Sequence, residues 1–317
     1  MPACPESVSH DSSGPALAGP DHAAAHRGFL LLLTAGLLWG TGGLAGHLLQ
    51  SAVGLHPLAV ATYRLLVGGL LISAFLAVSG RLRRVAWSRT LVRRLVGNGV
   101  LHAAFQSLYF ASLALVPVGL ATLVKIGSVP VFVTIGICLL TRRPPGARLG
   151  GALVAAVLGL ALLAGFPSAD AGPLRLAAGL GCALGAGLVF SVLTLLNRRP
   201  VAGLDPLVNV GLGCLLGGLL LTPAGLWVGM PLPAEPGGLA LLAFLGVVPT
   251  ALAYAAYFGG LRSSTDAATA MATITEPLTA ALLSLALLGE RMTPLGGVGA
   301  ALLVAAMLAE YVGPRRR

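Results

Sequence analysis

Residues 118–140 read VGLATLVKIGSVPVFVTIGICLL, a stretch of 23 residues with one charged side chain, Lys125. A helix needs about 20 predominantly apolar residues to cross the hydrocarbon core of a bilayer. Comparable stretches recur along the chain, and we expect spans at 28–49, 57–79, 95–115, 118–140, 148–165, 175–196, 205–229, 238–261, 264–288 and 293–313. The sequence therefore predicts an all-α integral membrane protein with ten transmembrane helices.

The composition agrees with this prediction. Of the 317 residues, 56% are hydrophobic and 9% are charged, whereas a soluble domain carries roughly 25% charged residues. So few charges could not cover the surface of a soluble domain of this size. Runs such as LLLL at 30–33 do not alternate as the strands of a membrane barrel would.

The basic residues predict the orientation of the spans. With the N-terminus inside, 16 of the 20 Lys and Arg residues fall on the inner side, and Arg175 and Arg291 fall on the outer side. Both termini are therefore expected in the cytoplasm of a multi-pass plasma-membrane protein. The net charge of +10 is explained by loops that face an anionic leaflet, so we expect no nucleic-acid partner.

The N-terminal residues and the cysteines show neither a secretion signal nor a metal-binding pattern. Residues 1–27 are rich in Ala, Ser, Pro and Asp, lack the pattern of a cleavable signal, and are expected to be a disordered cytoplasmic tail. The cysteines show no CxxC spacing, which argues against a metal site. We expect no metal and no cofactor.

The two halves of the chain repeat each other. When Ala121-Thr122 is aligned with Ala268-Thr269, Pro130 falls on Pro277, and Gly150 falls on Gly297. The chain is thus expected to contain two five-helix units, at 28–165 and 175–313. Because five is odd, the second unit begins on the opposite side of the membrane, and the repeats are inverted. Inverted repeats are a recurring architecture of secondary transporters, with the substrate site between them.

The sequence resembles the drug/metabolite transporter superfamily, in particular proteins with two EamA domains. The resemblance rests on short motifs in several spans: Leu38-Trp39-Gly40, Tyr63-Arg64, Gly246-Val247-Val248-Pro249-Thr250-Ala251-Leu252-Ala253-Tyr254, Tyr257-Phe258, Glu276-Pro277 and Leu287-Leu288-Gly289-Glu290-Arg291. It implies ten helices, movement of small metabolites and no ATPase. The chain departs from the family pattern at Lys125, and at Thr141-Arg142-Arg143, where an acidic residue usually closes the span.

Three ionisable residues lie within the predicted spans, Arg64, Lys125 and Glu276. Such residues cost roughly 2.5–3.5 kcal/mol each on insertion scales and are usually functional or paired. From the helical rise, all three lie about 10–12 Å below the outer surface. They are candidate substrate-binding residues for a carboxylate or phosphate. Alternatively, Glu276 forms a structural bridge with Lys125 or Arg64, or Arg64 is a packing element bonded to backbone carbonyls.

Polar and aromatic side chains form a second candidate layer. Asn98, His102, Gln106 and Tyr109 share one face of the third span because their spacing is helical. We expect this face to line a water-filled path, with interhelical hydrogen bonding as the alternative. Trp39 and Tyr254 complete the candidate substrate-binding set.

Pro130 and Pro277 occupy equivalent positions in two spans. A proline inside a helix removes a hydrogen bond and bends it. We expect these two residues to be hinges for alternating access, with static bends as the alternative.

Together these observations predict a secondary-active transporter that exports small polar or amphipathic metabolites, amino-acid-like or drug-like, by alternating access. Its partners would be a small-molecule substrate, the lipid bilayer and, as a candidate coupling ion, protons. Monomer and homodimer both remain open. The alternatives are a membrane-embedded lipid or isoprenoid enzyme, for which the paired carboxylates are missing from the sequence, and a non-transporting scaffold.

Overall fold

The structure is a computed structural model that describes residues 22–142, 147–164, 172–199, 201–261, 266–291 and 293–311. Within these ranges every regular element is a helix. The α helices are α1 (His22–Ser51), α2 (Pro57–Val78), α3 (Arg89–Leu113), α4 (Val118–Thr141), α5 (Ala147–Ala164), α6 (Pro173–Asn197), α7 (Pro206–Trp227), α8 (Pro236–Gly246), α9 (Ala253–Leu261), α10 (Asp266–Leu287) and α11 (Pro294–Tyr311). A 3₁₀ turn, η1 (Leu82–Arg84), precedes α3, and a π-helical segment, η2 (Val247–Leu252), joins α8 to α9.

Each predicted span coincides with a helical segment, and the eighth corresponds to α8, η2 and α9 together. Helix α1 begins at His22, inside the predicted tail, and residues 1–21 lie outside the described residues. Six of the described helical segments are long and apolar enough to cross a membrane. Helix α3 is not among them, since its first half carries Arg89, Arg93, Arg94 and Asn98.

The helices begin at sequence signals that satisfy their free N–H groups. Asp205 accepts hydrogen bonds from the backbone of Leu207 (2.8 Å) and Val208 (3.4 Å) at the start of α7. Ser88 caps α3 by accepting from the Leu91 N–H at 3.2 Å. Prolines occupy the first turn of α2, α6, α7 and α8, where the missing N–H costs nothing.

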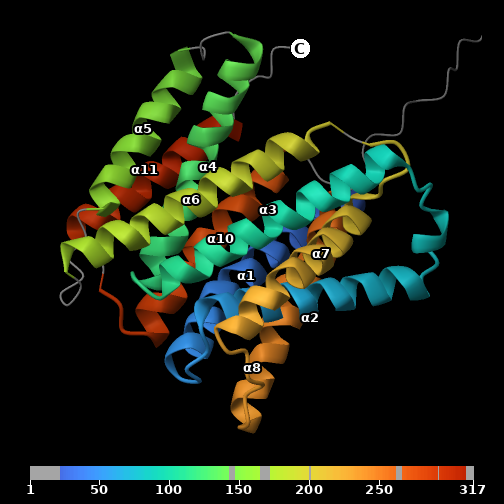
Figure 1. Cartoon of the computed structure of the whole chain (residues 1–317). Coiled ribbons are helices and arrows are strands. Elements are labelled where there is room, and N and C mark those ends of the chain that lie inside the picture. The colour runs from blue at the N-terminus through green and yellow to red at the C-terminus, as the bar shows by residue number, and fades with distance from the viewer. Residues whose placement is uncertain are drawn as a thin grey trace, which may run out of the picture.

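The helices form a closed ring of contacts. Going around it, α1 packs against α10, followed by α4, α6, α3, α7, α2 and α8, and the segment from α8 to α9 packs back against α1. Helices α5 and α11 pack against each other outside the α4–α10 junction. Figure 1 shows this pair at one side of the molecule and α2 with α7 at the opposite side. The first and second halves of the chain are thus interleaved around the ring.

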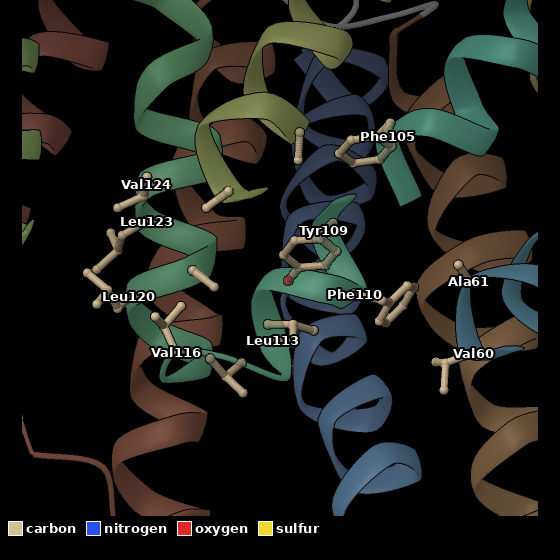
Figure 2. Packing of buried hydrophobic residues seen from close by; sticks show 14 of the residues in the cluster. Val60, Ala61, Phe105, Tyr109, Phe110, Leu113, Val116, Leu120, Leu123 and Val124 are labelled. Carbon is tan, nitrogen blue, oxygen red and sulfur yellow. The ribbon is translucent and has the colours of Figure 1, made fainter. Parts of the chain in front are cut away.

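The largest cluster of buried apolar residues lies where α3 passes α1, α2 and α4. Phe110 is fully buried, and Phe105 and Tyr109 of the same helix are nearly so. Figure 2 shows Tyr109 between these two phenylalanines, with Leu120 and Leu123 of α4 on one side and Val60 of α2 on the other. This cluster surrounds the position of the candidate site.

Glycines bring the backbones of α2 and α7 together. A Cβ atom placed on Gly69 would lie 2.4 Å from the backbone nitrogen of Leu215, and one on Gly218 would lie 2.8 Å from that of Leu66. Each helix therefore presents a glycine to the backbone of the other.

We expect Gly69→Ala to lower the free energy of unfolding by about 1–3 kcal/mol, because the added methyl group meets rigid backbone and forces the helices apart. Gly181→Ala is the matched control, since no atom of another described helix lies within 4 Å of a Cβ placed there. This control should leave stability unchanged or slightly raised. Thermal unfolding of the purified variants in one detergent measures the difference, and equal midpoints would contradict the steric argument.

Candidate functional site

A buried ion pair joins α4 to α10. The Lys125 Nζ atom lies 2.8 Å from Glu276 Oε1, and the two side chains are 8% and 20% exposed. Lys125 lies five residues before Pro130, and Glu276 lies directly before Pro277. Both helices continue through their prolines, and the role of the prolines as hinges stays a prediction. The pair places opposite charges on two helices that come from different halves of the chain.

Aromatic rings hold the ammonium group of Lys125. Its Nζ atom lies 4.2 Å from the ring centroid of Tyr109 and 5.7 Å from that of Phe105, within the range of a cation–π interaction. The Tyr109 hydroxyl lies 2.8 Å from Thr122 Oγ1 on α4. Lys125 is therefore stabilised by one carboxylate and two ring faces, all inside the helix ring.

Arg64, which the sequence placed at the same depth, contacts a different element. Its Nε donates to Thr250 Oγ1 (3.3 Å), and its Nη2 donates to the Pro249 carbonyl (3.4 Å). The guanidinium carbon lies 5.7 Å from the Phe110 ring centroid. Among the described residues, the cation that pairs with the Glu276 carboxylate is Lys125 and not Arg64. These contacts match the alternative in which Arg64 bonds backbone carbonyls.

The element that Arg64 contacts is the π-helical segment η2. Pro249 cannot donate a backbone hydrogen bond, and the Thr250 hydroxyl donates instead to the Leu245 carbonyl at 2.9 Å. π-Helical turns are frequent at functional sites. A span was predicted at 238–261 without a π-helical segment in it; Pro249 followed by a hydroxyl residue is the sequence signal of this segment.

The two remaining aromatic candidates lie together on α1 and α9. The Trp39 ring centroid lies 5.4 Å from that of Tyr254 and 5.0 Å from that of Tyr257. Tyr254 also stacks on Phe258 at 6.3 Å. The structure therefore joins these residues in one aromatic group between the first and eighth predicted spans.

The polar face of α3 is buried along its whole length. Asn98, His102, Gln106 and Tyr109 are each less than 5% exposed, so none of them faces lipid. Buried side-chain atoms almost always have hydrogen-bond partners, yet His102 Nδ1 and Gln106 Oε1 have none among the described residues. These two atoms are therefore buried polar groups to which the described residues supply no hydrogen bond.

Asn98 belongs to a closed ring of three side-chain amides. Its Nδ2 donates to Asn209 Oδ1 (2.8 Å), Asn209 donates to Asn197 (2.9 Å), and Asn197 donates back to Asn98 (2.8 Å). Arg94 also donates to the Asn197 amide oxygen (3.5 Å) and to the Leu196 carbonyl. The ring ties α3 to α6 and α7, which is the interhelical alternative for Asn98. Asn197 and Asn209 were not predicted as partners of Asn98, although all three amides lie near the predicted cytoplasmic ends of their spans.

Replacing Asn98 with Ala should lower the free energy of unfolding by about 1 kcal/mol, because interhelical hydrogen bonds in membranes contribute on that scale. The decrease in the free energy of unfolding of Asn98→Ala/Asn209→Ala should be smaller than the sum of the two single decreases. Either single substitution already breaks the amide ring, so the second removes fewer hydrogen bonds. A double-mutant cycle in detergent measures this coupling, and strictly additive losses would show that the amides act independently. Thr194→Ala, which removes a hydroxyl bonded within its own helix, is the control.

These features define a polytopic helical membrane protein with a charged and polar interior. The EamA-like transporter family matches residues 26–165 and 177–309. The chain therefore belongs to this family and, with it, to the drug/metabolite transporter superfamily, so it is a membrane transporter and not an enzyme. The resemblance drawn from the motifs is confirmed.

Two named relatives are similar over nearly the whole chain. An uncharacterized transporter of Bacillus subtilis, YwfM, is 29% identical over 292 residues, which cover 91% of this chain and 95% of that protein. An uncharacterized inner membrane transporter of Salmonella typhimurium, YicL, is 24% identical over 293 residues, covering 92% and 97%. A solved crystal structure with 22% identity matches 90% of this chain and 96% of its own with a TM-score of 0.61, which supports the fold.

Proposed function

We propose that this transporter is secondary-active and exports small polar or amphipathic molecules, amino-acid-like or drug-like, across the plasma membrane by alternating access. In this proposal the chain has ten spans in two inverted repeats, 28–165 and 175–313, with both termini in the cytoplasm. The substrate binds in the interior between the repeats. Protons are the proposed coupling ion.

The pattern of helix contacts supports the inverted repeats. In the proposed repeats, α1 corresponds to α6, α2 to α7, α3 to the segment from α8 to α9, α4 to α10 and α5 to α11. When each helix of a contacting pair is replaced by its counterpart, the result is again a contacting pair. The contact of α1 with α10 has its counterpart in α6 with α4, and that of α3 with α6 in the segment from α8 to α9 with α1. Contacts between α2 and α7, α4 and α10, and α5 and α11 map onto themselves. A two-fold axis in the membrane plane, as in other inverted-repeat transporters, would produce this pattern.

One observation carries the proposal, the Lys125–Glu276 ion pair on the α4–α10 junction. Burying two charges costs more than a well-packed apolar pair would, so the pair is expensive as a purely structural device. Glu276 retains a fifth of its side-chain surface, which leaves the carboxylate approachable. A substrate with a charged group could exchange partners with the pair without leaving a charge unpaired.

Candidate substrate-binding residues surround this pair in the proposal. Lys125 and Glu276 bind the charged groups, Tyr109 and Trp39 offer aromatic faces, and Gln106 supplies an unpaired amide oxygen. His102, Tyr254, Arg64 and Asn98 remain candidates for binding substrate, although the contacts of Arg64 and Asn98 support structural roles in this conformation.

The test begins with metabolite profiles of cells that lack or overproduce the protein. Compounds that accumulate in the first and are depleted in the second are then loaded, in labelled form, into proteoliposomes with purified protein. Efflux above that of protein-free vesicles is the expected result. No protein-dependent flux for any such compound would overturn the proposal.

A further inference from the structure

We infer that Glu290 is the latch of the outer gate, the residue that holds the outer ends of α4 and α10 together until the transporter opens outward. This inference rests on the proposed alternating-access function. The inference is drawn from a different contact, at Val118, which the helical rise places about 10 Å along α4 from Lys125.

The contact itself is a helix cap supplied from the other half of the chain. Glu290 Oε1 accepts a hydrogen bond from the Val118 N–H at 2.6 Å, and Oε2 accepts one from the Gly119 N–H at 3.1 Å. The residue at the N-cap position of α4 is Pro117, whose side chain makes no cap bond. A carboxylate at a helix N-terminus is favoured both by the free N–H groups and by the helix dipole.

The packing beneath the contact is close but incomplete. A Cβ atom on Gly119 would lie 2.7 Å from Ser284 Oγ and 3.5 Å from the Ala281 Cα atom of α10, so the two helices approach closely at this glycine. Just beside it, Leu120, Leu123, Ser284 and Leu285 line a cavity of about 20 Å³, enough for one water molecule. The carboxylate contact therefore lies beside apolar packing that leaves room for one water molecule.

The position of the latch explains how it could act on the site. The segment that carries Glu290 follows directly from α10, which bears Glu276, and the helix it caps bears Lys125. The internal alignment that places Gly150 on Gly297 places Arg143 on Glu290, so the second half alone supplies a carboxylate at this point. Releasing the cap would let the outer ends of α4 and α10 separate, as an outward-open state requires.

The test measures opening from outside the cell. Leu123, which is 2% exposed, is replaced by Cys in a chain whose native cysteines have been removed, and a membrane-impermeant maleimide is added to intact cells. Losing a helix cap shifts a two-state equilibrium about fivefold to tenfold, so Glu290→Ala should raise the labelling rate by that factor. Glu290→Gln, which keeps one acceptor oxygen, should give an intermediate rate.

Glu235→Ala is the matched control, since this carboxylate is exposed at the start of α8 and caps no N–H group; its labelling rate should equal that of the parent chain. The inference is overturned if Glu290→Ala labels at the parent rate in folded protein. It is also overturned if faster labelling comes with loss of cooperative thermal unfolding, because the contact would then be structural only. Flux in proteoliposomes is measured separately. If the parent protein transports but Glu290→Ala labels at the parent rate, the latch is wrong and the proposed function stands. If the parent protein shows no flux for any compound, the proposed function is wrong.

Discussion

Lys125→Met alone should lower the free energy of unfolding by about 3 kcal/mol, because it leaves the Glu276 carboxylate without its partner inside the helix ring. Glu276→Gln alone should cost a similar amount, since it strands the Lys125 ammonium at 2.8 Å from a neutral amide. The double variant should return to within about 1 kcal/mol of the parent chain, because a neutral pair of similar volume needs no compensation. Unfolding titrations of the four proteins in mixed micelles provide the full double-mutant cycle.

If the substrate supplied the anion that Lys125 needs, which is the substrate-binding interpretation of the sequence, Lys125→Met would fold normally. The structure pairs the two side chains directly, and Arg64, the other partner considered for Glu276, is bonded to Thr250 and Pro249. A Lys125→Met protein as stable as the parent would show that the pair contributes little and would return Lys125 to the substrate. Arg175→Met, at an exposed site that bonds the Ala114 carbonyl, controls for the loss of a cation.

The helical segments could be predicted almost completely, because apolar stretches of membrane-spanning length are a strong signal. The largest differences are at α1 and α3, where the helices begin at His22 and Arg89 rather than at 28 and 95. Both extensions carry polar or charged residues, so the apolar stretch begins several residues after the helix begins. The π-helical segment η2 was not predicted, although Pro249 followed by Thr250 marks it in the sequence. Pro249 cannot donate to the Leu245 carbonyl, and the Thr250 hydroxyl donates to it instead. The contact of Arg64 with the Pro249 carbonyl depends on the packing of α2.

The candidate site could be predicted as a set of residues but not as a set of partners. Depth along the spans correctly places Lys125 and Glu276 at one level, since they are in contact. Depth does not give the rotation of a helix about its axis, which is why Arg64 at a similar depth points to η2 instead. Glu290 was recognised as part of a motif, but its contact with α4 depends on the packing of two helices from different halves.

The second large effect concerns the driving force. In proteoliposomes with an acidic lumen, the parent protein should exchange protons for substrate and concentrate it inside the vesicles. A pH difference of one unit supplies about 1.4 kcal/mol per proton, so with one proton per substrate the steady-state concentration ratio should be about tenfold. The compounds used are those that the metabolite profiles and flux measurements identify.

Under the proposed coupling, Glu276→Gln should reduce this ratio to one, because an amide cannot take up a proton. Exchange of labelled for unlabelled substrate should be slower but still measurable, because the amide can still hydrogen-bond the substrate. The proposed coupling uses the Lys125–Glu276 hydrogen bond. When Glu276 takes up a proton, it loses the charge that attracts Lys125, and an anionic group of the substrate can then bind Lys125 in place of Glu276. Since Glu276→Gln is expected to be less stable than the parent, the Lys125→Met/Glu276→Gln protein should be measured beside it; it too should show no accumulation. Glu235→Gln, an exposed carboxylate outside the helix ring, should keep the tenfold ratio. A Glu276→Gln protein that still concentrates substrate in response to the pH difference would place the coupling proton on another group.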